Sequence, residues 1–384
     1  MRIIYLSSNL SIHDHRFLKK LSDSDHEVFL ITHYDGEKLP SYIQELKGIN
    51  KIHYKNPLAF ASGAEKYSIF TRKIRCWFAF LKSIFRLRRD MKKIKPDVIH
   101  AGWTQADGFM AALSGFRPLL LMPWGSDILI VPKKSRGMML KTKYALSKAD
   151  MITCDCENVK NRIIDYVNFP AEKIVVFPRG IDLKLFYSKR ENNRIRERLG
   201  WAKNKILLMT RSFRPVYGVE YFLHALPKVV ESCPETRVIL CGDGPLKDDF
   251  EKIINSYKLK DHVHFAGFIK NEELPEYLNA ADIYISSSLS DGTSLALLEA
   301  MASALPMVLS DVPSYLEWVV NNQNGYIVPR KNSQLLANRI IDLLKNDAKQ
   351  KQFGEKNYQI AQERADWDKN FNKLEEMYVL LGAN

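Results

Sequence analysis

Short apolar runs alternate with helix-length segments along the whole chain, and this alternation restricts the fold more than any other feature. The segments that read as helices include residues 14–23, 218–232, 246–257 and 332–347. Strands that alternate with helices form βαβ units, which build parallel sheets covered by helices on both faces. We therefore expect an α/β protein. The runs that we read as strands are RIIYLSS, EVFLITH, DVIHAGW, PLLLMPW, MITCD, KIVVFP, KILLMTR, RVILCG, VHFAGF, DIYISSS and PMVLSD.

The length of the chain predicts two domains. Its 384 residues are more than one hydrophobic core usually organises. The most polar interruption, YSKRENNRIRER at 187–198, lies near the middle. We expect two doubly wound, Rossmann-like domains joined there, with ligands bound beyond the carboxyl ends of the strands.

Composition excludes several classes of protein. Hydrophobic residues make up 46% of the chain and charged residues 26%, as in folded globular proteins. Five cysteines, an odd number, argue against a disulfide framework. We read Cys154 and Cys156 as structural thiols, with half of a metal site as the alternative. No apolar stretch is long enough for a transmembrane helix or for the core of a signal peptide, so we expect a cytoplasmic location.

The net charge of +13 is unevenly distributed. Residues 1–190 hold 33 Lys and Arg against 18 Asp and Glu, a balance of +15, while residues 191–384 hold 24 against 26. Within the basic half, residues 66–95 carry 11 Lys and Arg and a single acid, Asp90. This segment therefore needs an interpretation of its own.

Residues 66–95 read as an amphipathic helix, because apolar side chains recur at steps of three and four. One interpretation is a core helix with a solvated basic face. Another is contact with an anionic membrane surface, where such helices bury apolar side chains and attract acidic lipids. No nucleic-acid-binding motif accompanies the segment, so we expect no nucleic-acid partner. The recurring apolar residues are Phe70, Ile74, Trp77, Phe78, Leu81 and Phe85.

The stretch SDGTSLALLEAMASALP, residues 290–306, follows the run IYISSS and reads as a loop that enters a helix. Backbone N–H groups in the first turn of a helix can bind a phosphate or diphosphate. Asp291 would then accept hydrogen bonds from sugar hydroxyls and Glu299 from a ribose, which together describe a nucleotide sugar. The alternative is an ordinary N-cap followed by a surface glutamate. The first turn would contain Gly292, Thr293, Ser294 and Leu295.

Two arginines follow the strand KILLMT, at Arg211 and Arg214. At the carboxyl end of a strand they could clamp a diphosphate through charge-assisted hydrogen bonds. A pair of solvated surface arginines is the alternative. The glycines of CGDGP, 241–245, lack the spacing of a dinucleotide fingerprint, so we read them as a tight strand-to-helix turn.

Taken in order, these motifs resemble those of the large retaining glycosyltransferase family 4, which has the GT-B fold. Asp291-x7-Glu299 stands where that family has Glu-x7-Glu. The resemblance covers essentially the whole chain. It implies an acceptor-side domain at 1–186, a nucleotide-sugar-binding domain at 187–360 and a final helix, 361–384, that returns to the first domain. Further matching elements are Ala300-Met301-Ala302, Pro306-Met307-Val308, Arg179-Gly180-Ile181-Asp182, CGDGP, FAGF at 265–268, NNQNGYIVP at 321–329 and ADWDKNFNKLEEMY.

The resemblance implies transfer of a hexose-type sugar, with retention, from a nucleotide-diphosphate donor to a hydroxyl of a glycan or lipid-linked acceptor. The pathway would be cell-surface polysaccharide biosynthesis. From the charge of residues 66–95 we further expect a peripheral position on the inner face of the plasma membrane, with a soluble acceptor as the alternative. No metal and no cofactor beyond the donor substrate is expected. Arg211 and Arg214 would neutralise the diphosphate, and Ile269 would offer backbone contacts to the base. Acceptor-side candidates are Trp124, Asp127, His13 and Arg16.

Two other functions remain open, a nucleotide-sugar epimerase and a non-catalytic nucleotide-sugar-binding protein. The chain also departs from the family pattern at the site itself. Asp291 is one methylene shorter than the family's glutamate, and Trp124 stands where a histidine often contacts the sugar. Tyr217 occupies the place of the family's diphosphate lysine, for which Arg214 is the candidate substitute.

Overall fold

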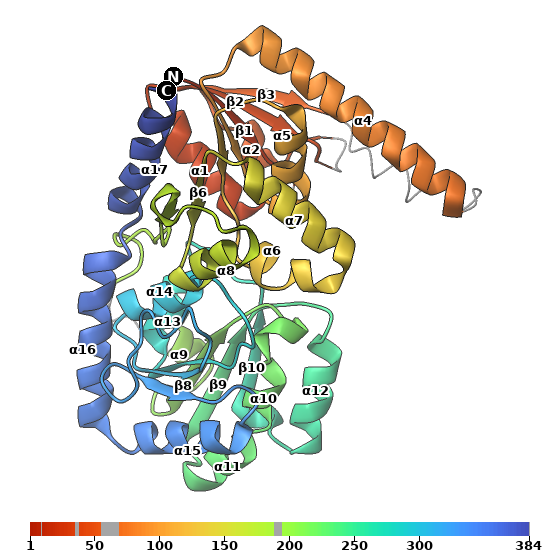
Figure 1. The fold of residues 1–384 in the computed structure, drawn as a ribbon. Helices are drawn as coiled ribbons and strands as arrows, with labels where there is room; N and C mark the ends of the chain where they lie inside the picture. Colours follow the sequence, from red (N-terminus) through yellow and green to blue (C-terminus); the bar gives the residue numbers. More distant parts are fainter. Residues whose placement is uncertain (9, 35–37, 55–68, 188–193, 384) are drawn as a thin grey trace. The chain divides into compact units, whose positions relative to one another are not determined.

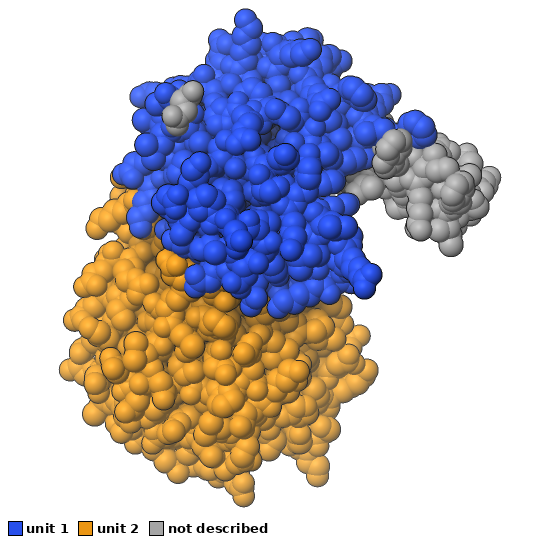
Figure 2. All heavy atoms as spheres, in the orientation of Figure 1, with its two compact units in different colours: residues 1–155, 159–177, 373–384 blue, residues 156–158, 178–372 orange. Residues whose placement is uncertain are grey.

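The computed structural model describes residues 1–8, 10–34, 38–54, 69–187 and 194–383, without the side chains of residues 12–13 and 69–77. The chain divides into two compact units, coloured blue and orange in Figure 2. Unit 1 consists of Met1–Asp155, Val159–Phe177 and Lys373–Asn384, and unit 2 of Cys156–Asn158 and Pro178–Asn372. Each unit contains one parallel sheet with helices packed on it, which confirms the expected pair of Rossmann-like domains (Figure 1).

Unit 1 is built on a seven-stranded parallel sheet of order β3-β2-β1-β4-β5-β6-β7. The chain adds strands on one side of β1 as far as β3, then crosses to β4 and continues on the other side. β1 and β4 therefore flank the switch point, where sheets of this kind bind ligands. The strands are β1 (Arg2–Leu6), β2 (Glu27–Thr32), β3 (Ile49–His53), β4 (Val98–Ala101), β5 (Leu119–Leu121), β6 (Met151–Cys154) and β7 (Ile174–Val176).

The helices of unit 1 cover both faces of its sheet. Helix α1 and the end of α17 lie on the same face, because Phe17 and Tyr378 both contact His100 of β4. Helices α4 and α7 both pack against α5. The bounds are α1 (Ile12–Ser22), α2 (Ser41–Gln44), α4 (Ile69–Ile94), η1 (Thr104–Gly108), α5 (Phe109–Ser114), α6 (Ser126–Leu129), η2 (Val131–Lys134), α7 (Arg136–Lys148), α8 (Glu157–Val167), η3 (Ala171–Lys173) and α17 (Trp367–Gly382).

Unit 2 has a six-stranded parallel sheet of order β10-β9-β8-β11-β12-β13, with its switch point between β8 and β11. The strands are β8 (Lys205–Thr210), β9 (Thr236–Cys241), β10 (Val263–Gly267), β11 (Ile283–Ser286), β12 (Met307–Ser310) and β13 (Tyr326–Val328). The helices are α9 (Arg194–Arg198), η4 (Pro215–Tyr217), α10 (Val219–Leu223), α11 (Leu226–Ser232), α12 (Lys247–Ser256), η5 (Lys260–His262), α13 (Leu274–Ala280), α14 (Leu295–Ala302), α15 (Ser333–Leu344) and α16 (Asp347–Arg364).

The structure corrects some predicted elements and confirms others. Strands β3 and β13 were not predicted, because INKIH is a half-buried edge strand with polar residues and YIV is only three residues long. The helix expected at 218–232 is two helices, with Pro227 in the first turn of the second. CGDGP is the expected tight turn: φ is +157° at Gly242, where a Cβ would lie 2.0 Å from the carbonyl oxygen of Arg211.

Helix α4 confirms the helix expected in the basic segment, but its apolar face is not the predicted one. Over its described side chains it buries Ile84, Leu87 and Met91. Phe78 is instead 62% exposed and Phe85 66% exposed. The side chains of Phe70, Ile74 and Trp77 lie outside the described residues.

Four of the cysteines have described side chains, and all four side chains are buried. They include Cys154 and Cys156, which supports the structural interpretation of that pair. Among the described residues, no group of three or more His, Cys, Asp or Glu side chains is placed to hold a metal ion.

Candidate functional site

The stretch 290–306 lies at the switch point of unit 2. Strands β8 and β11 are hydrogen-bonded neighbours, so the loops that follow them leave the same edge of the sheet. Helix α14 begins at Leu295, which is half-buried, and its N-cap is Ser294, whose Oγ accepts from the Leu297 N–H at 3.1 Å. The expectation that the helix starts at Gly292 is therefore wrong. Gly292 and Thr293 are buried in the loop that leads to the helix.

Glu299 lies in the second turn of α14 and is only 7% exposed. The alternative interpretation as a surface glutamate is therefore wrong. Helix α14 is buried continuously from Leu297 to Ala302, where a charged side chain costs free energy unless it has partners. The assignment of Glu299 to a ribose stays a prediction.

Arg211, directly after β8, is the centre of a buried hydrogen-bond network. Its Nη2 donates to Asp291 Oδ2 at 2.7 Å, to Tyr315 OH at 2.5 Å and to Ser294 Oγ. The ring of Tyr217 lies 5.2 Å from the guanidinium carbon, within range of a cation–π contact. Because Arg211 is 8% exposed, the alternative of a solvated surface arginine is wrong for this residue.

Arg211 keeps its positive charge although it is buried. Burial disfavours the guanidinium cation, but the oxygens of Tyr315 and Asp291 outweigh that effect and hold the pKa of Arg211 above its ordinary value. Its Nε has no hydrogen-bond partner in the part of the chain that the structure describes. A buried donor without an acceptor is costly, so the site is suited to an additional anion.

Two buried tyrosines in this network were missed at the sequence level. Tyr315 OH donates to Asp291 Oδ2 at 3.1 Å and shares a hydrogen bond of 3.1 Å with Ser286 Oγ. Tyr284 OH lies 3.3 Å from Thr210 Oγ1. Burial raises the pKa of both phenols, so both are neutral hydroxyl groups near pH 7. Tyr284 lies in the run DIYISSS, which was read only as a strand, and Tyr315 belongs to no motif that was singled out, so neither side chain was assigned to the site.

Side-chain hydrogen bonds tie the loops of this edge together. Ser287 Oγ donates to the carbonyl of Gly218 at 2.7 Å, and Ser314 Oγ donates to the carbonyl of Asp291 at 3.1 Å. Gly218 has φ of +52°, and a Cβ there would lie 2.5 Å from the carbonyl oxygen of Ser287. A side chain at this position would therefore push the two loops apart.

Two other predicted donor residues lie outside the network. Arg214 is exposed just before η4, and its side chain makes no hydrogen bond or ion pair with the residues that are described. The interpretation of Arg214 as a surface arginine therefore stays open. Ile269 is half-buried after β10, next to Phe268, which is 75% exposed.

In unit 1, the acceptor-side candidate Asp127 is fully buried. Its Oδ2 accepts from the Thr104 N–H at 2.9 Å and hydroxyl at 2.7 Å, and its Oδ1 accepts from the Trp124 N–H at 2.8 Å. Burial raises the pKa of Asp127, and these hydrogen bonds oppose the rise. Asp127 therefore fixes the loop that carries Trp124.

The other acceptor-side candidates lie around the start of α1. Trp124 is half-buried, and its ring packs edge-on against Phe17 with centroids 6.1 Å apart. Arg16 is half-buried on α1. His13 belongs to α1 as well, but its side chain lies outside the described residues.

A further carboxyl group, missed at the sequence level, lies at the switch point of unit 1. Asp107 is 1% exposed in η1, a π-helical turn after β4, and its Oδ2 accepts from the Ser8 N–H at 3.1 Å. Burial raises the pKa of Asp107 to about 7, although hydrogen bonds from Ser8 favour the ionised form. A lone aspartate in a loop carries no pattern that would have identified it.

Comparison with known proteins begins with two family models. The model described as "Glycosyl transferase 4-like" matches residues 2–156, and the model described as "Glycosyl transferases group 1" matches residues 191–360. An alpha-monoglucosyldiacylglycerol synthase from Acholeplasma laidlawii is 23% identical over 290 residues, which cover 71% of this chain and 73% of the synthase.

Solved structures resemble this chain over nearly its full length. HepE from Anabaena, in complex with UDP and glucose, has a TM-score of 0.79 and 20% identity, covering 99% of this chain and 100% of that one. TarM from S. aureus, in complex with fondaparinux, alpha-GlcNAc-glycerol and UDP, has a TM-score of 0.72 and 13% identity, covering 98% and 99%. At these identities the likeness shows the fold.

Proposed function

Because this chain is a glycosyltransferase of the GT-B fold and of the family 4 kind, we propose that it transfers a hexose-type sugar from a nucleoside diphosphate to a glycan or lipid-linked acceptor hydroxyl. The transfer belongs to polysaccharide or glycolipid biosynthesis and proceeds with retention, without a metal or a further cofactor. The complexes of HepE with UDP and with UDP-glucose support a donor of this class.

The observation that carries the proposal is the buried Arg211 at the switch point of unit 2. Its Nε has no acceptor among the described residues, and the N-terminal end of α14 lies at the same edge of the sheet. A nucleoside diphosphate brings the anion that both features favour. The guanidinium and the helix end would stabilise the charge that grows on the leaving diphosphate.

The two carboxylates of the Asp291-x7-Glu299 element support retention without a protein nucleophile. Asp291 accepts hydrogen bonds from Arg211 and Tyr315, and Glu299 is buried within α14. In the proposed mechanism neither carboxylate acts as a nucleophile. In the proposed reaction the bond between the anomeric carbon and the diphosphate oxygen breaks, and the acceptor oxygen bonds to that carbon on the same face. The acceptor proton passes to the departing diphosphate.

Titration calorimetry with UDP, GDP, ADP and their sugar conjugates tests the donor. We expect one nucleoside diphosphate to bind the native chain and to lose its binding in Arg211→Ala. If none binds, the donor assignment fails. Turnover of the bound donor with and without glycan acceptors, followed by NMR of the anomeric proton, tests the rest. An epimerised donor without any acceptor would indicate an epimerase, and binding without turnover would indicate a binding protein.

We also propose that unit 1 contacts an anionic membrane surface through α4 and α7. Phe78 and Phe85, both exposed, are seven residues apart and therefore lie on one side of α4. Helix α7, which packs on the same neighbour α5, exposes Leu140 (68%) and Tyr144 (36%). Exposed apolar side chains among lysines and arginines suit the head-group region of a bilayer. Among the described residues, no helix combines the length and the apolar character needed to cross a bilayer.

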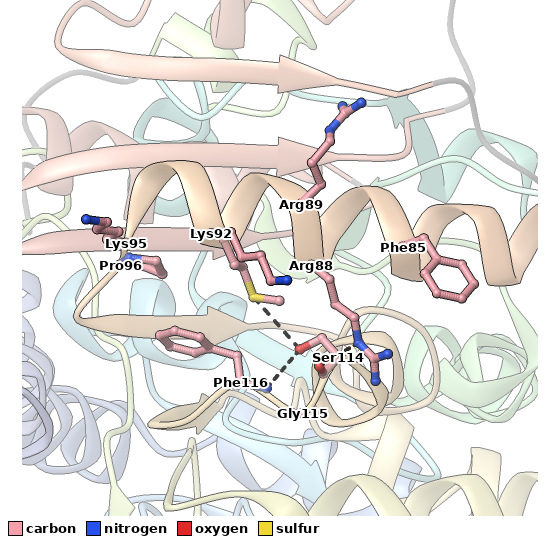
Figure 3. Close-up of a pocket in the computed structure, with 10 residues that line it drawn as sticks. Phe85, Arg88, Arg89, Lys92, Lys95, Pro96, Ser114, Gly115 and Phe116 are labelled. Carbon is pink, nitrogen blue, oxygen red and sulfur yellow. Dashed lines mark hydrogen bonds between the residues drawn. The ribbon is translucent and has the colours of Figure 1, made fainter.

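A pocket of about 810 Å³ between the end of α4 and the loop after α5 adds a basic site to this surface (Figure 3). Arg88 and Lys92 point toward the side of α4 on which Ser114 and Phe116 lie. The Nε of Arg88 donates to the Ser114 carbonyl at 2.8 Å, which fixes its charge at the pocket. Among the described residues that line the pocket, none is acidic, so an acidic lipid head group fits it.

Co-sedimentation with vesicles tests this partner. We expect binding to vesicles that contain phosphatidylglycerol, little binding to phosphatidylcholine vesicles, and weaker binding at high salt. Phe85→Ser and Lys92→Gln should each reduce binding several-fold, whereas Lys270→Gln, at an exposed lysine of unit 2, should not. Equal binding by all three variants would contradict the proposed surface.

A further inference from the structure

The bonding of Arg211 conflicts with a simple diphosphate clamp. A guanidinium grips a phosphate best through two parallel N–H bonds, and it has two edges that offer such a pair, Nε with Nη2 and Nη1 with Nη2. Both edges include Nη2. In this structure Nη2 donates to Asp291, Tyr315 and Ser294. Nη2 carries two hydrogens, which these three acceptors already share, and each edge needs one of them. A diphosphate can therefore form two parallel bonds with Arg211 only if it displaces at least one present acceptor of Nη2.

Asp291 is the acceptor that a diphosphate displaces most readily. Its carboxylate is the anion in the network, 2.7 Å from Nη2, and the loop that carries it leaves its side chain 19% exposed. The hydroxyl groups of Tyr315 and Ser294 are both buried, and Ser294 also caps α14. A carboxylate that leaves Arg211 can turn toward the open side of the site, whereas the two hydroxyl groups cannot.

We propose that Asp291 is an exchangeable counter-ion of Arg211: it pairs with the guanidinium in the free protein and gives up its place when the donor diphosphate binds. The exchange rests on the proposed nucleoside diphosphate donor. It keeps Arg211 paired with an anion in both states, which avoids an isolated buried charge. It also reconciles the observed ion pair with the sugar contact expected from the sequence, because the displaced carboxylate becomes available to the hydroxyl groups of the sugar.

Tyr315 is the positioning residue of this exchange. Its hydroxyl group accepts from Arg211 at 2.5 Å and donates to Asp291 Oδ2 at 3.1 Å, so it holds the two charged groups together. Its side chain is fully buried, and its hydroxyl also contacts Ser286 Oγ at 3.1 Å. Removal of this hydroxyl would loosen the ion pair without any change of charge. A variant without this hydroxyl therefore distinguishes the proposed exchange from simple repulsion between Asp291 and a diphosphate.

Calorimetry with the free nucleoside diphosphate and with its sugar conjugate tests the proposal on the native chain, Asp291→Asn and Tyr315→Phe. We expect Asp291→Asn to bind the free diphosphate about five- to tenfold more tightly, because no anion competes for Arg211. The same variant should lose the added affinity that the sugar gives the native chain. Tyr315→Phe should bind the free diphosphate about two- to threefold more tightly and keep the preference for the sugar conjugate.

Asp311→Asn is the matched control, because Asp311 follows the adjacent strand β12 and pairs with the exposed Arg330 at 2.9 Å. It removes one negative charge near the same edge and should leave both affinities unchanged. The exchange is overturned if Asp291→Asn binds the free diphosphate no more tightly than the native chain. It is equally overturned if Asp291→Asn gains affinity while Tyr315→Phe does not, since repulsion alone would then explain the gain. A native chain that binds no nucleoside diphosphate would refute the donor itself.

The same exchange predicts how turnover changes. A diphosphate product leaves Arg211 more easily when Asp291 can take its place. Asp291→Asn should therefore show stronger product inhibition by the nucleoside diphosphate, with kcat reduced more than kcat/KM for the donor. A merely structural role of Asp291 would lower the melting temperature and leave product inhibition unchanged.

Discussion

The carboxyl edges of the two sheets differ in the charged groups that they bury. In unit 2 the edge holds a buried arginine, Arg211, whose Nε has no acceptor among the described residues. In unit 1 it holds the buried aspartates Asp14, Asp107 and Asp127, which accept hydrogen bonds from hydroxyl and N–H groups. One edge therefore suits an anion, and the other is a polar surface organised by carboxyl groups.

This difference changes the interpretation of the net charge. The first half of the chain carries a balance of +15, which alone would suggest a basic binding edge for an anionic acceptor. The basic residues gather instead on α4 and around its pocket, whose lining includes Arg88, Lys92 and Lys95. The positive net charge of unit 1 therefore describes the surface of α4. It does not describe the carboxyl ends of the strands, where the charge depends on the individual residues.

The largest expected effect comes from the buried cation. Arg211→Ala should reduce kcat/KM for the donor about a thousandfold, or ~4 kcal/mol, because the leaving diphosphate loses its charge partner. Arg214→Ala, at an exposed side chain in the same segment, should change kcat/KM by less than about threefold. Steady-state kinetics on both variants measures these losses, and melting curves show whether both variants are folded. Equal losses would place the diphosphate at Arg214 instead.

The second prediction concerns the buried acid of unit 1. The pKa of Asp107 is raised from 3.8 in the unfolded chain to about 7 in the folded one, because burial disfavours the carboxylate. Folding therefore favours the protonated group, and its stabilising effect is present at low pH and is lost as the pH rises from about 4 to about 7. The loss is of the order of 4 kcal/mol.

Asp107→Asn should remove this part of the pH dependence. Between about pH 5 and about pH 8, the free energy of unfolding should therefore fall more in the native chain than in the variant. Urea unfolding at the two pH values measures the difference. Asp23→Asn, at an exposed aspartate at the end of α1, is the control and should follow the native chain. If the native chain were equally stable at both pH values, Asp107 would be ionised throughout, and the contrast between the two edges would become sharper.

Sequence patterns determined the architecture and the place of the site, because both depend on features with a period. Apolar alternation located most strands, and the Asp291-x7-Glu299 spacing located the loop and helix at the switch point of unit 2. The polar contacts within the site could not be predicted in this way. They depend on side chains from the loops after β8, β11 and β12, such as Arg211 and Tyr315, which are 104 residues apart in the chain.

The buried face of α4 is a second feature that sequence patterns alone could not predict. Spacing alone placed Phe78 and Phe85 on an apolar face and did not decide whether that face meets the core or a membrane. Helix α5 packs on α4, and the buried side of α4 carries Ile84, Leu87 and Met91. Periodicity identifies a helix and its candidate faces. Which face is buried depends on the neighbouring elements, and the sequence of the helix does not identify those elements.

The smallest expected effect tests how unit 2 holds its cation. Tyr217 stands where the resembled family has a lysine, and its ring lies 5.2 Å from the guanidinium carbon of Arg211. A cation–π contact of this kind contributes about 0.5–1 kcal/mol, so Tyr217→Leu should weaken nucleoside diphosphate binding about two- to fivefold. Tyr217→Phe keeps the ring and should bind as the native chain does. Tyr358→Leu, at an exposed tyrosine of α16, should have no effect. A loss of equal size in Tyr217→Phe would assign the contribution to the hydroxyl group, and the ring face would then play no part in holding Arg211 for the diphosphate.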